Sequence, residues 1–180
     1  MAHITTSVEY GIHCLLWLVG DDDRSLSSRD LAELQGVSPS FVAKIFPRLE
    51  KAGIVRASEG VRGGYRLARP AEDITFLEIV DAIEGDKPLF DCQDIRGRCA
   101  VFGNRPPGWA LAGTCAVHAA MLQVEQAMRD ALARQTLGSV AARFGRKAPV
   151  EFFDDVRAWV DTRLAGRVAA RGKPRREMPS

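Results

Sequence analysis

The stretch from Ser38 to Gly64 constrains the fold of this chain most strongly, because it has the pattern of a short helix followed by a glycine-tipped hairpin. Ser38 is a good N-cap, and Pro39 suits the first helical position, where its missing N–H costs no hydrogen bond. Gly53 is placed to end the helix. Apolar residues at steps of three and four predict one buried helix face. They are Phe41, Val42, Ile45, Leu49 and Ala52.

Residues on both sides of this stretch complete a recognisable unit. Residues 54–57 and 65–68 have strand character, and the turn between them is rich in glycine. Upstream, Ser27 to Asp30 has the pattern of a capping box and predicts a helix that ends before Gly36. Two helices joined by a short turn and followed by a hairpin are typical of a winged helix-turn-helix, which places a helix in a major groove and the hairpin tip on neighbouring DNA.

The charge distribution supports a nucleic-acid partner. The chain has 180 residues and a net charge of only +2, but residues 24–69 contain nine Lys or Arg against four Asp or Glu. Residues 70–95 contain one basic residue against eight acidic residues. This asymmetry predicts a cationic surface on the helix and hairpin.

The winged-helix interpretation assigns DNA contacts to residues on the helix and the hairpin. Base edges would be met by Ser38, Ser40, Phe41 and Lys44, and phosphates by Arg48, Lys51 and Arg56. Arg62, at the hairpin tip, would enter a minor groove. The alternative is that these side chains form only the solvated face of a surface helix.

The remaining chain predicts a mainly α fold, with a two-stranded wing and a long dimerisation helix. A capping box at residues 6–9 predicts a first helix that extends to about Val19. Residues 1–85 would form the DNA-binding domain, 86–118 a cysteine sensor loop, 119–165 the dimerisation and C-terminal helices, and 166–180 a disordered basic tail. The long helix has an apolar stripe typical of a coiled coil. It consists of Val117, Met121, Val124, Met128, Ala131 and Leu132.

The aperiodic segment 86–114 is longer than compact domains usually contain unless it is functional. Cys92, Cys99 and Cys115 lie in it or just after it, with the spacing C-x6-C-x15-C. Thiolates suit an iron–sulfur cluster or zinc, and a thiol–disulfide sensor is the other possibility. A fourth ligand could come from His118, His13 or Glu9, although Glu9 has a capping role and both histidines could be ordinary polar residues. Cys14 lies near an apolar helix face and is expected to pack there.

Several of these stretches together resemble the Rrf2 family of winged-helix regulators, of the IscR and NsrR type. The resemblance is carried by Tyr10-Gly11, by the segments LSSRDLAELQGVSPSFVAKIFPRLEKAGIV and ITFLEIVDAIEG, and by the wing tip from Arg62 to Leu67. It implies a homodimer joined through the long helix, a palindromic operator in double-stranded DNA, and an iron–sulfur cluster in the cysteine loop. Two features depart from familiar members: the cysteine spacing is wider, and Ala43 occupies a helix position that is polar in some of them.

The sequence therefore predicts a DNA-binding transcriptional regulator that responds to redox, iron or nitrosative state. Repression is its expected mode of action. A 2Fe–2S cluster is favoured over a 4Fe–4S cluster. Mixed Cys, His and Glu ligation would raise the reduction potential relative to ligation by cysteines alone, which suits a redox sensor. We find no nucleophile–base pair, phosphate loop or paired carboxylates in a motif context, so an enzyme or metal carrier is the weaker alternative. The longest apolar run, near residues 14–20, is too short to span a membrane, and a cytoplasmic location is expected.

Overall fold

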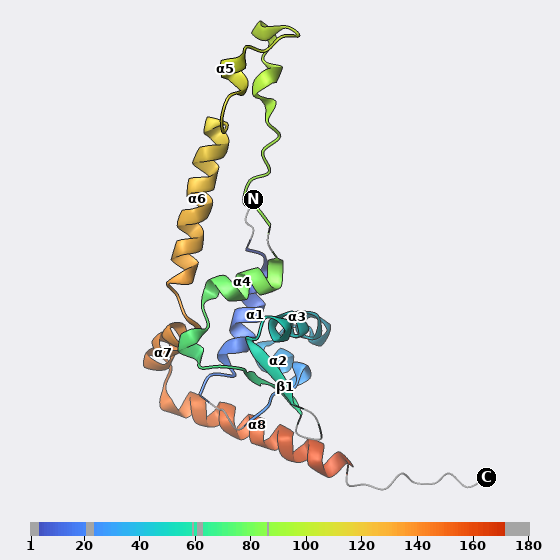
Figure 1. The fold of residues 1–180 in the computed structure, drawn as a ribbon. Coiled ribbons are helices and arrows are strands. Elements are labelled where there is room, and N and C mark those ends of the chain that lie inside the picture. The colour runs from blue at the N-terminus through green and yellow to red at the C-terminus, as the bar shows by residue number, and fades with distance from the viewer. Residues whose placement is uncertain (1–3, 21–23, 59, 61–62, 86, 172–180) are drawn as a thin grey trace, which may run out of the picture.

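The computed structural model describes residues 4–20, 24–58, 60, 63–85 and 87–171. It confirms a mainly α-helical fold with one two-stranded antiparallel sheet (Figure 1). The elements are α1 (Thr6–Leu16), α2 (Ser28–Gln35), α3 (Pro39–Lys51), β1 (Val55–Ser58), β2 (Gly64–Leu67), α4 (Phe76–Glu84), α5 (Gly108–Leu111), α6 (Ala116–Ala133), α7 (Leu137–Lys147) and α8 (Val150–Arg171), with short 3-10 turns at Ala71–Asp73, Ile95–Arg98 and Ala100–Phe102.

The winged helix-turn-helix forms as the local signals predict. The Ser27 side chain accepts from the Asp30 backbone N–H, while the Asp30 carboxylate accepts from the Ser27 backbone, which completes a capping box at the start of α2. Gly36 ends α2 in the left-handed conformation, with φ of 72°. Strands β1 and β2 pair so that Val55 faces Leu67 and Ser58 faces Gly64.

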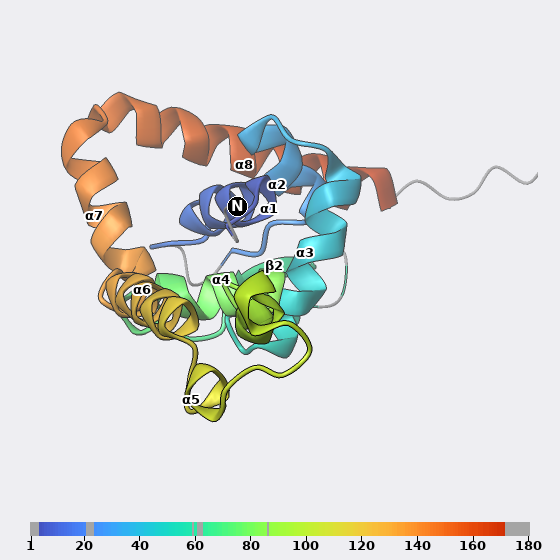
Figure 2. The same cartoon turned by 90° about the horizontal axis from the view of Figure 1, so that it is seen from above.

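The hydrophobic core lies where α1, α2, α3 and α4 meet. Viewed from above, α1 is surrounded by the other helices of this body and by α7 and α8 (Figure 2). The largest fully buried side chains come from all parts of the winged helix. They include Leu15, Leu31, Phe46, Leu49, Ile54, Ile74, Ile79 and Ile83.

Helix α6 and the segment before it project from this body as a stalk (Figure 1). None of the residues of α6 is buried. Its contact with the body is made near α4, where the Arg129 guanidinium donates to both carboxylate oxygens of Asp81 at 3.0 and 2.8 Å. The first part of the apolar stripe is uncovered in a single chain, since Val117 is 62% exposed and Val124 is 54% exposed, whereas Leu132 at its end packs against the core.

Helices α7 and α8 return to the body and wrap around its far end (Figure 2). Leu137, at the start of α7, is fully buried, and its N–H donates to the Ile74 carbonyl at 2.8 Å. Thr136 caps α7, as the sequence suggested. Helix α8 then runs along the end of the body opposite the stalk (Figure 1).

Some predicted boundaries were wrong. The N-cap of α1 is Thr5 rather than Thr6, so Glu9 is not part of a capping box, and α1 ends at Leu16 rather than near Val19. Segment 86–114 holds α5 and two 3-10 turns. The predicted disordered tail began at residue 166, but α8 continues to Arg171; residues 172–180 lie outside the described part of the chain. Among the described residues, no helix is both long and apolar enough to cross a membrane.

One feature of α3 was not anticipated. Pro47 lies inside this helix. A proline has no N–H to donate to the carbonyl four residues earlier, which here belongs to Ala43, so the helix lacks one backbone hydrogen bond. The helix nevertheless spans Pro39–Lys51, because four of its apolar residues are buried against the core.

Candidate DNA interface and cysteine loop

The first turns of α3 present a small polar surface. Ser38, Ser40 and Lys44 are exposed. Ser38 occupies the N-cap position but makes no capping hydrogen bond with its side chain; its hydroxyl lies 2.8 Å from that of Ser40 instead. These hydroxyls and the Lys44 ammonium are free to meet groups outside the chain, as base readout by the start of a recognition helix requires.

Two of the predicted DNA-contact residues on α3 have packing roles in the structure. The Phe41 ring is half-buried and meets the Tyr10 ring edge-on, with centroids 5.1 Å apart. The Arg48 guanidinium donates to the Ile83 carbonyl at 2.6 Å, which joins α3 to the end of α4. We therefore leave Phe41 and Arg48 out of the proposed contact set.

The wing carries a pair of arginines, Arg56 and Arg66, of which only Arg56 was predicted from the sequence to contact DNA. Arg56 on β1 is directly opposite Arg66 on β2, so both side chains share one face of the hairpin. The Nε atom of Arg66 is buried and has no hydrogen-bond partner among the described residues. Like charges in this arrangement repel unless an anion lies between them. The period-two alternation of the strands could have revealed Arg66.

Two further predicted contact residues lie elsewhere. Lys51 is exposed at the end of α3, and Arg62 lies outside the described residues.

Backbone contacts hold the wing against the helix-turn-helix unit. The Tyr65 N–H donates to the Leu26 carbonyl at 2.8 Å, and the Leu26 N–H donates back to the Tyr65 carbonyl at 3.1 Å. Gly64 lies so close to this segment that a Cβ atom there would be 2.5 Å from the Leu26 carbonyl carbon. The glycine at the base of the wing is therefore needed for close backbone approach.

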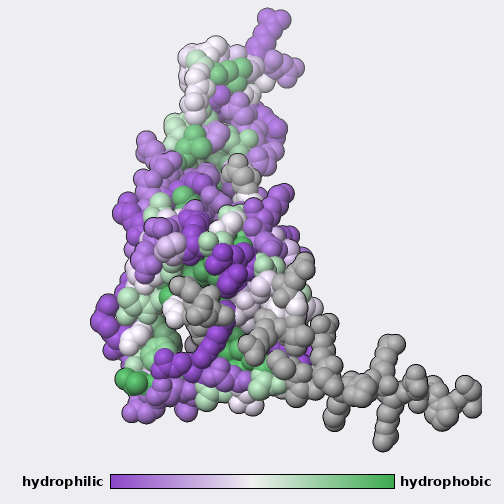
Figure 3. Space-filling view, turned by 60° about the horizontal axis from the view of Figure 1, so that its bottom comes forward, coloured by the Kyte–Doolittle hydropathy of each residue, from purple (hydrophilic) through white to green (hydrophobic). Residues whose placement is uncertain are grey.

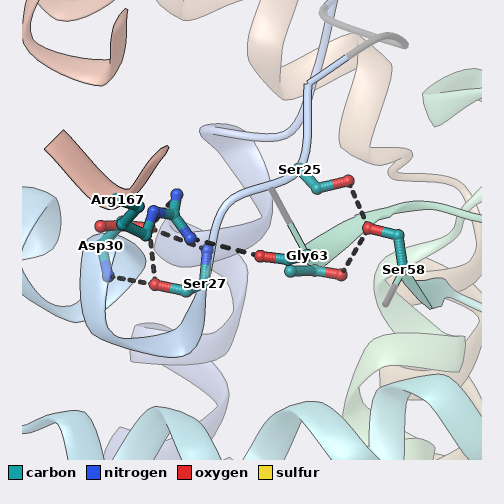
Figure 4. Close-up of polar contacts among 7 residues, drawn as sticks. Ser25, Ser27, Asp30, Ser58, Gly63 and Arg167 are labelled. Atoms are coloured by element: carbon teal, nitrogen blue, oxygen red, sulfur yellow. Dashed lines mark hydrogen bonds and ion pairs between the residues drawn. The ribbon is translucent and has the colours of Figure 1, made fainter. Parts of the chain in front are cut away.

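Helix α8 adds a side-chain link between the same elements. Arg167 pairs with the Asp30 carboxylate at 2.7 Å and donates to the Gly63 carbonyl at 3.2 Å (Figure 4). Nearby, the Ser58 hydroxyl on β1 donates to the Ser25 hydroxyl at 2.8 Å (Figure 4). Because Asp30 belongs to the capping box of α2, one guanidinium joins α8, α2 and the wing turn.

The cysteine loop places Cys115 at the N-cap of α6. Backbone N–H groups of His118 and Val117 point at its sulfur and lower the pKa of the thiol, with a further contribution from the Arg96 charge. Arg96 also interacts electrostatically with Cys92. Its guanidinium donates to the carbonyls of Ala112 and Gly113, at 3.2 and 2.9 Å, which secures the segment before Cys115.

The other candidate ligands are more scattered. Cys99 is exposed between the two 3-10 turns. His118 stacks near Phe90, with ring centroids 6.2 Å apart. Glu9 and His13 are exposed on α1, in the body, whereas the loop lies beyond the stalk (Figure 1). Within the described residues, no three His, Cys, Asp or Glu side chains are arranged to hold a metal ion.

The fit of an iron–sulfur cluster to this loop is mixed. Three thiols near one another in sequence provide suitable donors, and two of them share Arg96 as a neighbour. The described positions do not bring the three thiols together around one site, so the loop would have to rearrange before all three could bind one group. Cys14 is different: it is buried in the core, and burial raises the pKa of its thiol to about 12, in agreement with the expected packing role.

Comparison with known proteins agrees with this geometry. Protein rrf2 of Nitratidesulfovibrio vulgaris is 33% identical over 97 residues, which cover 53% of this chain and 65% of that protein. The structure of CymR, the global cysteine regulator of B. subtilis, has a TM-score of 0.60 at 20% identity and covers 79% of this chain and 98% of CymR. T. potens IscR also gives a TM-score of 0.60, at 22% identity, over 83% of this chain and 95% of IscR.

The family match covers the winged helix, the cysteine loop, α6 and most of α7. A family model described as "Iron-dependent Transcriptional regulator" matches residues 4–143. Helix α8 lies beyond that match. The fold and the wing are both accounted for by one assignment: this chain belongs to the Rrf2 family of DNA-binding transcriptional regulators.

Proposed function

We propose that this protein is a cytoplasmic, homodimeric regulator that binds a palindromic operator in double-stranded DNA and senses redox, iron or nitrosative state through its cysteine loop. Repression is the expected output. In this proposal Ser38, Ser40 and Lys44 read base edges, while Lys51, Arg56 and Arg66 bind phosphates, and Arg62 reaches a minor groove.

The opposed pair Arg56 and Arg66 is the observation that carries the DNA-binding part of the proposal. A phosphate between the two guanidinium groups would relieve their repulsion and supply a partner for the Arg66 Nε atom. The wing is joined to the segment before α2 through Leu26, Gly64 and Tyr65, and α2 in turn packs against α3. Both parts can therefore dock on one duplex as a unit.

The test is operator binding as a function of salt. The operator is first selected from a randomised duplex library with the wild-type protein. Arg66→Gln should weaken binding on all sequences and reduce the salt slope by about one per subunit, because one phosphate contact is lost. Ser40→Ala should instead relax the preference for the selected sequence.

Lys147→Ala is the matched control, because Lys147 is exposed at the far end of α7. It should leave both the affinity and the salt slope unchanged. If Arg66→Gln and Lys147→Ala behave alike, the wing is not the phosphate-binding surface.

The uncovered stripe of α6 supports the homodimer. Val117 and Val124 lie at a spacing of seven residues on a helix with no buried residue, and this spacing is typical of the residues that pair two helices in a coiled coil. Packing two copies along this seam would bury the stripe and set the separation of the two recognition helices.

The cysteine loop supports the sensing part of the proposal. Cys92, Cys99 and Cys115 would hold the cluster, with His118, or His13 or Glu9 of a partner subunit, completing the ligand set. A bound iron–sulfur cluster would supply one-electron redox chemistry and reactivity toward small oxidants. Arg96 orients the chain before Cys115, and the α6 N-terminus stabilises the Cys115 thiolate, which is the form that binds metal.

Anaerobic purification tests the sensor. Wild-type protein should show visible absorbance and bound iron, and Cys92→Ala should lose both. Cys14→Ala, which removes a buried thiol outside the loop, should retain them. A colourless wild-type protein without iron would overturn the cluster assignment.

A thiol–disulfide switch between Cys92 and Cys115 is a second candidate, favoured by a specific observation. The Arg96 charge acts on both thiols, and the pKa of Cys115 is lowered. In this case, operator affinity would change on treatment with a mild oxidant and recover with a dithiol reductant, in the absence of iron. Cys99→Ala would leave this response intact but would abolish cluster binding, so the two chemistries are separable.

A further inference from the structure

A cavity lies between the end of α1, helix α7 and the first half of α8, away from the cysteine loop. Its volume is about 450 Å³. That size falls within the range of pockets that bind small molecules in proteins, about 300 to 1,000 Å³. Three aromatic side chains contribute to its lining: Trp17 from α1, Phe144 from α7 and Phe153 from α8.

Most of the lining is apolar, and the aromatic rings are held in place by one another. Trp17 and Phe144 meet edge-on at 6.3 Å, and Phe144 and Phe153 do so at 5.8 Å. The Trp17 indole N–H donates to the Gln35 side chain at 2.8 Å, which fixes that ring. On the face shown in Figure 3, hydrophobic residues gather over the corner where α7 meets α8.

A few charged groups complete the lining. Arg24 and Arg157 contribute cationic side chains, whereas Glu72 is the acidic residue of the lining. Glu72 is packed against Gly138, in the first turn of α7, where a carboxylate is stabilised by the helix N-terminus. Arg24 pairs with Asp161 at 3.3 Å and its Nη1 atom is buried, whereas Arg157, which pairs with Asp154, is 59% exposed and lies at the rim.

We propose that this cavity is an effector site for a small amphipathic anion, with an aromatic or branched aliphatic body and one carboxylate or sulfonate group. The body fills the space among Trp17, Phe144 and Phe153, and the anionic group meets Arg157 at the rim. The cavity needs α8, which lies beyond the residues that the family model matches.

Helix α8 connects this cavity to the DNA interface. Val160 lines the cavity, and Arg163 and Arg167 follow it on the same helix face. Arg163 pairs with Glu33 on α2, and Arg167 joins Asp30 to the wing carbonyl of Gly63. A ligand that shifts α8 would therefore act on the wing, and this regulatory step rests on the proposed DNA-binding function.

The binding test uses two matched fluorescent probes: anilinonaphthalene sulfonate and its neutral analogue, N-phenyl-naphthylamine. Both should bind wild-type protein, and the sulfonate should bind more tightly. Ala141→Trp, which places a large ring in the cavity, should weaken both probes by about tenfold. Ala158→Trp, on an exposed position of α8 outside the lining, should have no effect. Equal probe affinities in the two variants would overturn the site.

A second variant guards against misfolding of Ala141→Trp. Arg157→Gln changes an exposed side chain, so the fold should be retained. It should weaken the sulfonate by about threefold or more while leaving the neutral probe unchanged, because only one probe carries the charge. A sulfonate affinity that does not respond to Arg157→Gln would refute anion recognition at the rim.

The regulatory step has its own readout. Saturating sulfonate should change operator affinity by about fivefold in wild-type protein and have little effect on Arg167→Gln. Probe binding without a change in operator affinity would refute the link through α8 while retaining the site. The titrations of the two fluorescent probes, unlike this measurement of operator affinity, contain no DNA. Their outcome is therefore independent of whether the proposed operator binding is correct.

Discussion

Gly64 shows how one residue fixes the position of the wing. Its Cα is so close to the Leu26–Ser27 backbone that a methyl group could not be accommodated without moving one of the two segments. We expect Gly64→Ala to lower the free energy of unfolding by about 2 kcal/mol or more, as for other substitutions that overpack a rigid contact. Urea denaturation measures this change.

Gly145→Ala is the matched control for this prediction. Gly145 is exposed in α7, and a Cβ there would meet no atom within 4 Å. Because alanine favours the helix, we expect a gain of about 0.5 to 1 kcal/mol. Equal effects at the two glycines would show that the contact of Gly64 with Leu26 does not exist in solution.

The cysteines should differ sharply in reactivity. The α6 backbone N–H groups lower the pKa of Cys115, so more of this thiol is ionised at a given pH, and its alkylation rate should level off at a lower pH than that of an ordinary cysteine thiol. Cys14, with its pKa raised by burial to about 12, should react only after unfolding. Iodoacetamide labelling of the metal-free, reduced protein at several pH values, followed by peptide mass spectrometry, measures both rates. A rate at Cys115 that levels off only at the pH of an ordinary thiol would contradict the described position of Cys115.

Residue types predicted the chemistry of the surface better than the role of each side chain. Ser38, Ser40 and Lys44 are exposed, as the helical periodicity indicates. Phe41 and Arg48 make contacts with α1 and α4 that depend on tertiary packing, which spacing within α3 does not encode. Arg66 was missed because its meaning depends on the strand register, which pairs it with Arg56.

At the level of elements, α8 is expected to stabilise the wing. Replacing Arg167 by Gln removes the charge that neutralises Asp30, whose side chain is only 7% exposed, and weakens the link to Gly63. We expect a loss of about 1 to 3 kcal/mol in stability, together with faster amide hydrogen exchange in β1 and β2.

Arg163→Gln provides the comparison for Arg167→Gln. The Arg163–Glu33 pair is more exposed than the Arg167–Asp30 pair, and such surface pairs contribute about 1 kcal/mol or less. Hydrogen exchange in the wing should therefore change little. If both variants accelerate exchange in β1 and β2 equally, Arg167 has no special role in holding the wing.

Elements with strong local signals were predicted well, and those that depend on context were not. Capping residues and glycines located α2, α3 and the wing. The first helix was predicted to start one residue late, because Thr5 and Thr6 are chemically equivalent as caps and Thr5 is selected by its contact with Glu84. The end of α8 was misplaced because a basic composition resembles a disordered tail, whereas Arg163 and Arg167 have acidic partners on α2.

For the whole molecule, the uncovered seam of α6 predicts a dimer whose stability depends on concentration. Val124→Glu would place a charge in the seam and should raise the dissociation constant by about a hundredfold or more, since a buried unpaired charge costs several kcal/mol. Sedimentation equilibrium measures the change. Gln123→Glu, one position away and outside the stripe, should leave the dimer intact; a monomeric wild-type protein would refute the seam.

The overall architecture was predictable because local patterns and charge agree with one another, whereas long-range placement was not. Nothing in the sequence indicated that α8 would close a cavity against the end of α1, because contacts such as that of Trp17 with Phe152 join residues more than a hundred positions apart. The predicted gathering of Cys92, Cys99 and Cys115 is likewise a long-range property of the loop, and the described positions do not bring all three together.

Pro47 has a consequence for how the molecule fits its duplex. The missing hydrogen bond to Ala43 divides α3 into a leading half, which carries Ser40 and Lys44, and a trailing half, which is anchored by Leu49 in the core. Bending at this joint requires less distortion than bending an uninterrupted helix. Because Val42, Ile45 and Phe46 also bury the leading half in the core, this freedom is restrained, and the helix presents Ser40 and Lys44 at a defined tilt.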